Sequence, residues 1–158
     1  MGNELYRKAC RKAQQIMNDA FEGTVFFAFS EEQFKEGMKK IGAKSPKELY
    51  SMNGTGGFYK KSDAPKIHKA FADMSKVKAD ALASGGEEYA FQMFSEELAN
   101  HEFGYARDLD PTIEATGYEV EDICKSKVLW SGMVRALETY GLTPETIELN
   151  YGIRQAFA

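Results

Sequence analysis

Cysteine and histidine, on which many enzyme and metal sites depend, are scarce in this sequence. The chain of 158 residues has two of each. Cys10 and Cys124 lie far apart and no CxxC pair occurs, so buried, reduced thiols are the expected state. With only His68 and His101 available, most acid–base chemistry would have to use paired carboxylates.

Long hydrophobic runs are missing as well. No segment reaches the roughly 18 consecutive apolar residues that a membrane-spanning helix requires. The polar start of the chain does not fit a signal peptide, and Tyr6 stands where a myristoylation signal has serine or threonine. These absences make the cytoplasm the expected compartment.

The motifs of common enzyme classes are also absent. GxxxxGK[ST], GxSxG and HExxH do not occur, the last because residue 105 is tyrosine. The glycine-rich stretch 53–57 has no lysine at the spacing of a phosphate-binding loop, so we interpret it as a turn between a helix and a strand. We therefore expect no catalytic residue, no cofactor and no bound metal, and hence no enzyme.

Length and composition predict one globular domain over residues 1–158. Hydrophobic residues make up 43% of the chain and charged residues 28%, which is typical of folded proteins. The length suffices for one core but not for two domains of ordinary size. Hinges are expected only at the turn-rich stretches 53–57 and 84–86.

The spacing of apolar residues predicts an α+β fold that is mostly helical, with about six to seven helices around a small antiparallel β-hairpin or sheet. Ser30 and Gln33 form a capping-box signature, and glycines at 85–86 are expected to end a helix. The expected strands are 24–29 and 58–60, paired with each other. Helical patterns cover 3–21, 31–41, a short segment from 45, a segment from about 63 to 83, 87–103, 110–115, 119–140 and a segment from 143.

Charge is distributed very unevenly along the chain. Residues 1–86 hold 15 Lys/Arg and 10 Asp/Glu, a net charge of +5. Residues 87–122 hold 1 Arg and 11 Asp/Glu, a net charge of −10. Residues 123–158 hold 4 Lys/Arg and 3 Glu, a net charge of +1. We call residues 87–122 the acidic segment. Mutual repulsion makes such a segment costly for the folded state, which favours a positively charged partner, while a merely solvated face remains the alternative.

Carboxylates spaced along helices and loops can take the positions of nucleic-acid phosphates in a basic groove. The hypothesis is therefore a nucleic-acid mimic that inhibits another protein by binding it. Exposed tyrosines among the acids would add anchoring area. The residues predicted to contact the partner are Glu87, Glu88, Glu96, Glu97, Glu102, Tyr105, Asp108, Asp110, Tyr118, Glu119, Glu121 and Asp122.

Two other hypotheses stay open. Glu97 and His101 lie at i,i+4 on one predicted helix face and can ligate together, which suggests a small metal- or ligand-binding enzyme, although two ligands do not complete a site. The basic face of the first helix can contact nucleic acid directly, or it can meet the acidic segment of a second copy in a homodimer. That face consists of Arg7, Lys8, Arg11 and Lys12.

Three stretches resemble a group of small proteins from phages and mobile elements of gut bacteria. They are residues 26–37 (FFAFSEEQFKEG), 56–63 (GGFYKKSD) and 97–103 (ELANHEF), and the likeness extends over about residues 24–123. That group is largely of unknown function. Small acidic proteins of such origin are often counter-defence proteins, including anti-CRISPR proteins. The resemblance implies an inhibitor of a CRISPR effector nuclease with its guide RNA, acting in the cytoplasm of a bacterial host cell.

Overall fold

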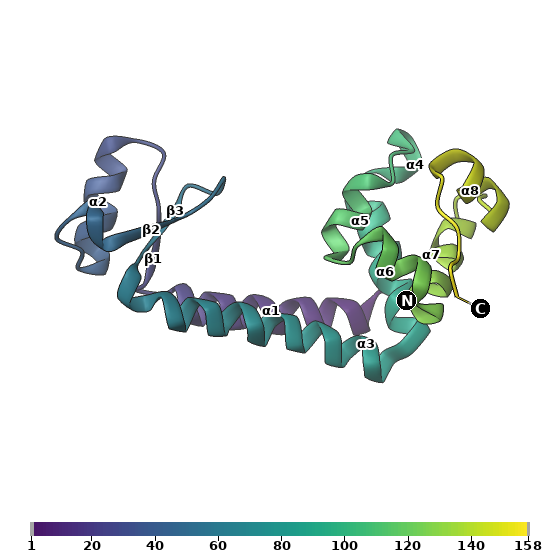
Figure 1. Ribbon diagram of the computed structural model, residues 1–158, viewed down its shortest axis with the longest axis horizontal. Coiled ribbons are helices and arrows are strands. Elements are labelled where there is room, and N and C mark those ends of the chain that lie inside the picture. The colour runs from purple at the N-terminus through teal and green to yellow at the C-terminus, as the bar shows by residue number, and fades with distance from the viewer. Residues whose placement is uncertain (1, 158) are drawn as a thin grey trace. The chain divides into compact units, whose positions relative to one another are not determined.

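The computed structural model describes residues 2–157 and confirms the predicted fold class. Most of the chain is helical, and three short antiparallel strands form one sheet (Figure 1). Two single 3₁₀ turns at Pro46–Glu48 and Lys61–Asp63 flank the second and third strands. The elements are α1 (Glu4–Phe21), β1 (Val25–Phe27), α2 (Glu31–Ile41), β2 (Leu49–Met52), β3 (Gly57–Lys60), α3 (Ala64–Asn100), α4 (Phe103–Ala106), α5 (Asp110–Thr116), α6 (Val120–Lys125), α7 (Lys127–Glu138) and α8 (Pro144–Tyr151).

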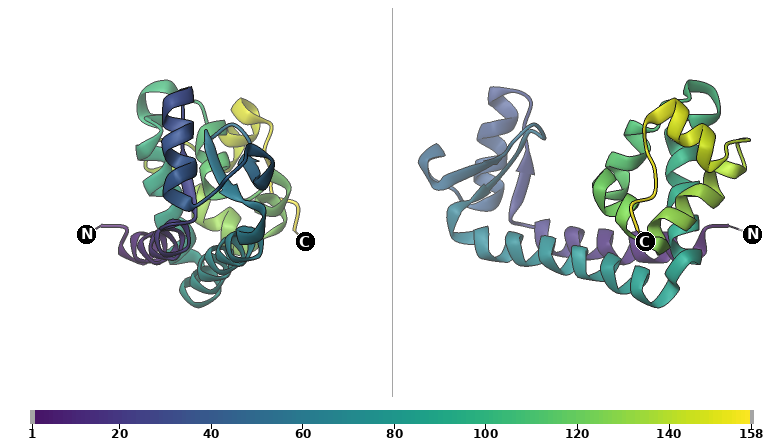
Figure 2. Two further views of the ribbon diagram at one scale, coloured as in Figure 1. Left: turned by 90° about the vertical axis from the view of Figure 1, so that its left-hand side faces the viewer. Right: turned by 45° about the vertical axis from the view of Figure 1, so that its right-hand side comes forward.

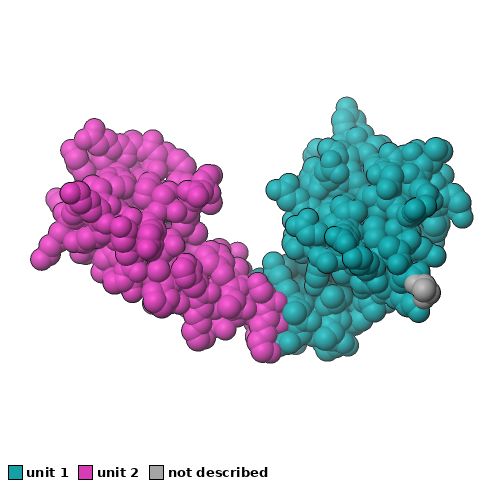
Figure 3. Space-filling model, viewed as in Figure 1, with its two compact units in different colours: residues 1–10, 78–158 teal, residues 11–77 magenta. Residues whose placement is uncertain are grey.

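The chain forms two compact units (Figure 3). Unit 1 comprises residues 1–10 and 78–158, and unit 2 comprises residues 11–77. Helices α1 and α3 contribute to both units. The expectation that the whole chain behaves as one domain stays a prediction.

The sheet belongs to unit 2 and has the strand order β1-β3-β2. The predicted pairing of the first and last strands is confirmed, with Val25 opposite Tyr59. Strand β2 was not predicted, because its Leu-Tyr-Ser-Met sequence lacks a clear alternation of apolar and polar residues. It pairs with β3 at the other edge, with Tyr50 opposite Tyr59.

Helix α2 covers one face of this sheet, and Figure 2 shows the two side by side in both views. The rings of Phe26, Phe34 and Phe58 lie 5.0–5.6 Å from one another, centroid to centroid. The helix begins as predicted: the Ser30 side chain accepts a hydrogen bond from the Gln33 backbone N–H. Gly37 lets the helix approach the sheet, since a Cβ there would lie 2.1 Å from the Phe26 ring.

Two predicted helix boundaries can be compared directly with the structure. Gly86 has φ 56° and ψ −139°, so α3 consists of two helical segments that meet within the predicted break at 84–86. The predicted continuous helix 119–140 is wrong. Ser126 has extended backbone angles and its hydroxyl accepts a hydrogen bond from the Leu129 N–H, so it ends α6 and caps α7.

The core of unit 1 lies between the second segment of α3 and the helices that follow it. Tyr89, Phe94 and Leu98 of α3 are fully buried, as are Met133 and Leu137 of α7. No described helix combines the length and apolar character needed to cross a membrane.

Candidate protein-binding surface

The carboxylates of the acidic segment differ in whether unit 1 already engages them. Glu88 lies 2.8 Å from Arg135, and Glu121 lies 2.5 Å from Lys125, each measured between an oxygen and a side-chain nitrogen. Glu96 and Glu97 bind residues of α1. These four acids therefore have partners within the chain, which lowers the charge that they offer to another molecule.

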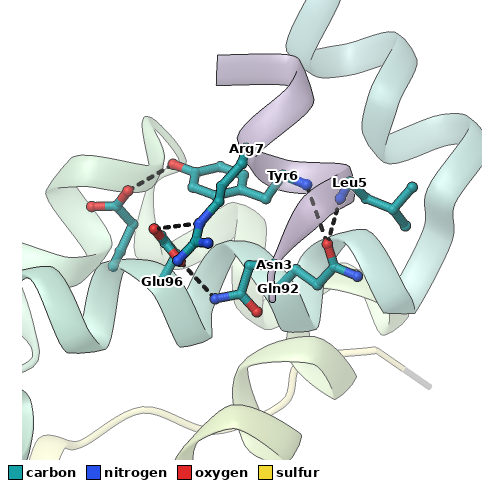
Figure 4. Close-up of polar contacts among 7 residues, drawn as sticks. Asn3, Leu5, Tyr6, Arg7, Gln92 and Glu96 are labelled. Atoms are coloured by element: carbon teal, nitrogen blue, oxygen red, sulfur yellow. Dashed lines mark hydrogen bonds and ion pairs between the residues drawn. The ribbon is translucent and has the colours of Figure 1, made fainter. Parts of the chain in front are cut away.

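Glu96 belongs to a polar cluster that ties the start of α1 to α3 (Figure 4). Its oxygens accept hydrogen bonds from Arg7 Nε and Nη2, both at 3.0 Å, and from Asn3 Nδ2 at 2.7 Å. Gln92 Oε1 accepts the backbone N–H groups of Leu5 at 2.7 Å and Tyr6 at 3.3 Å. Since the first N–H groups of a helix have no intrahelical acceptor, Gln92 supplies one, and the cluster is a structural clamp.

Glu97 joins this clamp to His101. The Tyr6 hydroxyl donates to Glu97 Oε1 at 2.8 Å, and His101 Nε2 lies 3.4 Å from Glu97 Oε2. Burial, together with the hydrogen bond to Glu97, raises the pKa of Tyr6, so its hydroxyl stays a donor. Across residues 2–157, no group of three or more His, Cys, Asp or Glu side chains is placed to hold a metal ion. The Glu97–His101 pair thus gains no third ligand there.

Other acids gather at α5 and the start of α6. Asp110, Glu114 and Glu119 are exposed and line one concavity of about 260 Å³ together with Ile113 and Tyr118. None of these three carboxylates forms an ion pair within the described part of the chain. We call Asp110, Glu114 and Glu119 the acidic triad.

The triad could be found only in part from the sequence. Glu114 is one of the eleven acids of the segment but was not among the predicted contact residues. The structure places it in the same concavity as Asp110 and Glu119. Asp108 and Asp122 have local roles in addition to their charge. Asp108 Oδ1 accepts the Asp110 N–H at 3.1 Å, and Asp122 Oδ2 accepts the Glu119 N–H at 3.3 Å, so they fix the starts of α5 and α6.

Tyr105 lies on the short helix α4, close to these acids in the sequence, and contacts on both sides hold α4 in place. Phe103 is fully buried, and the Arg107 guanidinium lies over its ring at 5.6 Å and donates to the Tyr140 carbonyl at 3.1 Å. Glu102 and Arg107, at the two ends of α4, have φ of 53° and 56°, a conformation that costs free energy for residues with a Cβ. The Tyr105 side chain is 94% exposed. Exposed tyrosines of this kind are common as anchors in protein–protein interfaces.

Three other predicted contact residues are placed as follows. Tyr118 is half-buried, and burial raises the pKa of its hydroxyl, so it offers only part of its ring to a partner. Glu87 and Glu102 are exposed, Glu87 at the start of the second segment of α3 and Glu102 at the start of α4.

The basic face of α1 is divided between the units. Arg7 lies in unit 1 and is bound by Glu96, while Lys8 and Lys12 are exposed and Arg11 also has an internal interaction. Counted over whole units, unit 1 has 8 Lys/Arg and 16 Asp/Glu, a net charge of −8. Unit 2 has 12 and 8, a net charge of +4. The negative charge thus belongs to unit 1.

The Arg7–Glu96 contact predicts how stability depends on pH. The hydrogen bonds from Arg7 and Asn3 lower the pKa of Glu96 below its ordinary value. A carboxyl with a lower pKa in the folded state stabilises the fold above its unfolded pKa, and this contribution is lost as the pH falls through the folded pKa. The Glu96→Gln variant should therefore lose less stability than the wild type on acidification below about pH 4.5.

Thermal melts of both proteins from pH 7 to pH 3 measure this difference. Because about half of the Arg7 side chain is exposed to solvent, which screens the ion pair, we expect only a small difference in stability between the two proteins at neutral pH. Glu114→Gln, which removes a carboxylate without an ion-pair partner among residues 2–157, is the matched control. Parallel acid transitions for wild type and Glu96→Gln would contradict the prediction.

A family model described as "Family of unknown function (DUF7659)" matches residues 5–155 of the chain. No curated protein and no solved structure matches it.

Proposed function

The chain belongs to the DUF7659 family of unknown function, and from the surface of unit 1 we propose that it is a binding protein without catalytic activity, which inhibits a nucleic-acid-handling protein by occupying its basic groove. The observation that carries this proposal is that unit 1 exposes both an acidic triad without ion-pair partners and, on α4, a tyrosine that is 94% exposed. The triad would meet Lys and Arg side chains that normally bind phosphates, and Tyr105 would fill a pocket between them.

A CRISPR effector nuclease with its guide RNA is the partner that we propose, on the basis of the resemblance to small phage and mobile-element proteins. The protein would then be a counter-defence inhibitor in the cytoplasm of a bacterial host. Its acids would compete with guide RNA, target DNA or the DNA-flanking motif for a positively charged channel. Steering by opposite charge would make association fast and sensitive to salt.

The direct test is capture of partners on the immobilised protein from lysates of gut bacteria, with and without nuclease treatment, followed by mass spectrometry. The expected result is a nucleic-acid-binding protein that is retained after nuclease treatment. The same protein should then block cleavage by a purified CRISPR effector in proportion to its molar ratio. Capture that depends on intact nucleic acid would instead support direct nucleic-acid binding through Lys8 and Lys12 and overturn the proposal.

Tyr105, on α4 of the same unit, provides a second measurement. The Tyr105→Ala variant should weaken partner binding by about 2 kcal/mol, the cost of losing a central aromatic anchor. It should leave the melting temperature unchanged, because the ring is almost fully exposed. Tyr50→Ala, which removes a 45% exposed tyrosine from unit 2, is the control and should bind normally. Equal affinities of the Tyr105→Ala variant and the wild type, measured by calorimetry, would rule out Tyr105 as an anchor.

A further inference from the structure

Unit 2 has an apolar groove that plays no part in the proposed function. Met17 and Phe21 of α1, Phe27 of β1, Met52 of β2 and Phe71 of α3 line a concavity of about 510 Å³. The side chain of Phe71 is 41% exposed, and that of Phe27 is 50% exposed. The edge-to-face contact between Phe21 and Phe71, with centroids 6.0 Å apart, forms one wall. We call this concavity the phenylalanine groove.

The apolar surface continues beyond the groove. Phe29 is 80% exposed, and its ring lies against Gly56, next to Thr55 on the rim. Contiguous exposed aromatic groups of this kind mark interaction sites on soluble proteins. Two methionines in the lining add flexible side chains that can adapt to an inserted group. The groove therefore suits an apolar side chain presented by another protein surface.

Charge indicates which surface that is. Unit 2 carries a net charge of +4, and unit 1 carries −8. A second copy of the chain thus offers unit 2 an oppositely charged surface at the same concentration as itself. The rim of the groove includes one acid, Glu22, so the attraction comes from the net charge of the unit rather than from the rim.

Unit 1 also provides an apolar side chain of suitable size. Leu149 on α8 is 82% exposed. Glu145 and Glu148 precede it by four residues and one residue, and both are exposed as well. Glu148 forms an ion pair with Arg154, with 3.8 Å between Glu148 Oε1 and Arg154 Nη1. Helix α8 thus presents one exposed aliphatic side chain next to two carboxylates.

We propose that the phenylalanine groove of one copy binds Leu149 on α8 of a second copy, so that the protein associates head-to-tail. The contact is heterologous, because the phenylalanine groove and Leu149 are different surfaces and belong to different units of each copy. It uses neither the acidic triad nor Tyr105, so partner binding and self-association can be measured and can fail independently.

Sedimentation equilibrium over a range of concentrations tests this proposal. The wild type should show a rising average mass, and Phe71→Asp and Leu149→Asp should each weaken self-association about tenfold or more. Val128→Asp, which places the same charge at a 37% exposed valine of α7, is the matched control and should associate like the wild type. Thermal melts check that every variant is folded, and Phe27→Asp replaces Phe71→Asp if the latter unfolds.

Mixing the variants separates a head-to-tail contact from other arrangements. A Phe71→Asp chain keeps its leucine and a Leu149→Asp chain keeps its groove, so their equimolar mixture should form a heterodimer although each alone is monomeric. A wild type that stays monomeric at all concentrations would overturn the proposal. A Leu149→Asp variant that still self-associates would also overturn it. The groove would then contact a different part of the second copy, for example the same groove.

Discussion

Reversing the charge of the acidic triad is expected to abolish partner binding while leaving unit 1 folded. The variant with Asp110→Lys, Glu114→Lys and Glu119→Lys changes the net charge by +6. Attraction to a basic groove becomes repulsion, which both slows encounter and leaves like charges in contact. We expect a loss of affinity of about 100-fold or more, corresponding to about 2.7 kcal/mol. Calorimetry or surface binding at two salt concentrations measures it.

The fold should tolerate this change because the three side chains are exposed and have no ion-pair partner within residues 2–157. Glu119 is also the N-cap of α6, so its replacement is expected to cost about 1 kcal/mol of stability without unfolding unit 1. The matched control reverses Glu31, Glu32 and Glu36, three exposed acids of α2 in unit 2. It introduces the same +6 charge and should keep most of the affinity. If both triple variants bind equally well, the acidic triad is a solvated face and the proposed function is wrong.

The Gly132→Ala substitution should destabilise unit 1 strongly, although helix propensity alone predicts the opposite. In an exposed helix, replacing glycine by alanine stabilises by about 1 kcal/mol. At Gly132, however, α7 packs directly against α3. A Cβ would lie 2.4 Å from the Cβ of Ala90 and 2.8 Å from the backbone nitrogen of Phe91. Backbone atoms cannot move aside cheaply, so we expect a net loss of about 3 kcal/mol from overpacking.

Chemical denaturation followed by circular dichroism measures this loss, and Ser131→Ala at the adjacent, partly exposed position is the control. A Gly132→Ala variant as stable as the wild type would mean that α7 and α3 separate without cost.

Much of the secondary structure was predictable because its determinants are local. The cap at Ser30, the break at Gly86 and the pairing of the strands around 25–27 and 57–60 follow from residues a few positions apart or from turn chemistry. Ser126 shows the limit of this reasoning. Apolar residues keep helical spacing on both sides of it, and its hydroxyl, by capping α7, interrupts the helix without changing that spacing.

The candidate site divides in the same way. The sequence by itself determined that negative charge is concentrated at 87–122, that Tyr105 lies among those acids and that common catalytic motifs are absent, since these are properties of composition and order.

Only the tertiary structure decided which carboxylates are already engaged, because their partners are distant in the chain: Arg7 is 89 residues from Glu96, and Arg135 is 47 residues from Glu88. The folded chain also brings Asp110, Glu114 and Glu119 to one concavity and braces Tyr105 outward through contacts of Arg107 with Tyr140 and Tyr151. Such contacts depend on how the helices pack against one another. The local pattern of apolar and polar residues predicts helices and strands, but it does not show which distant residues come into contact.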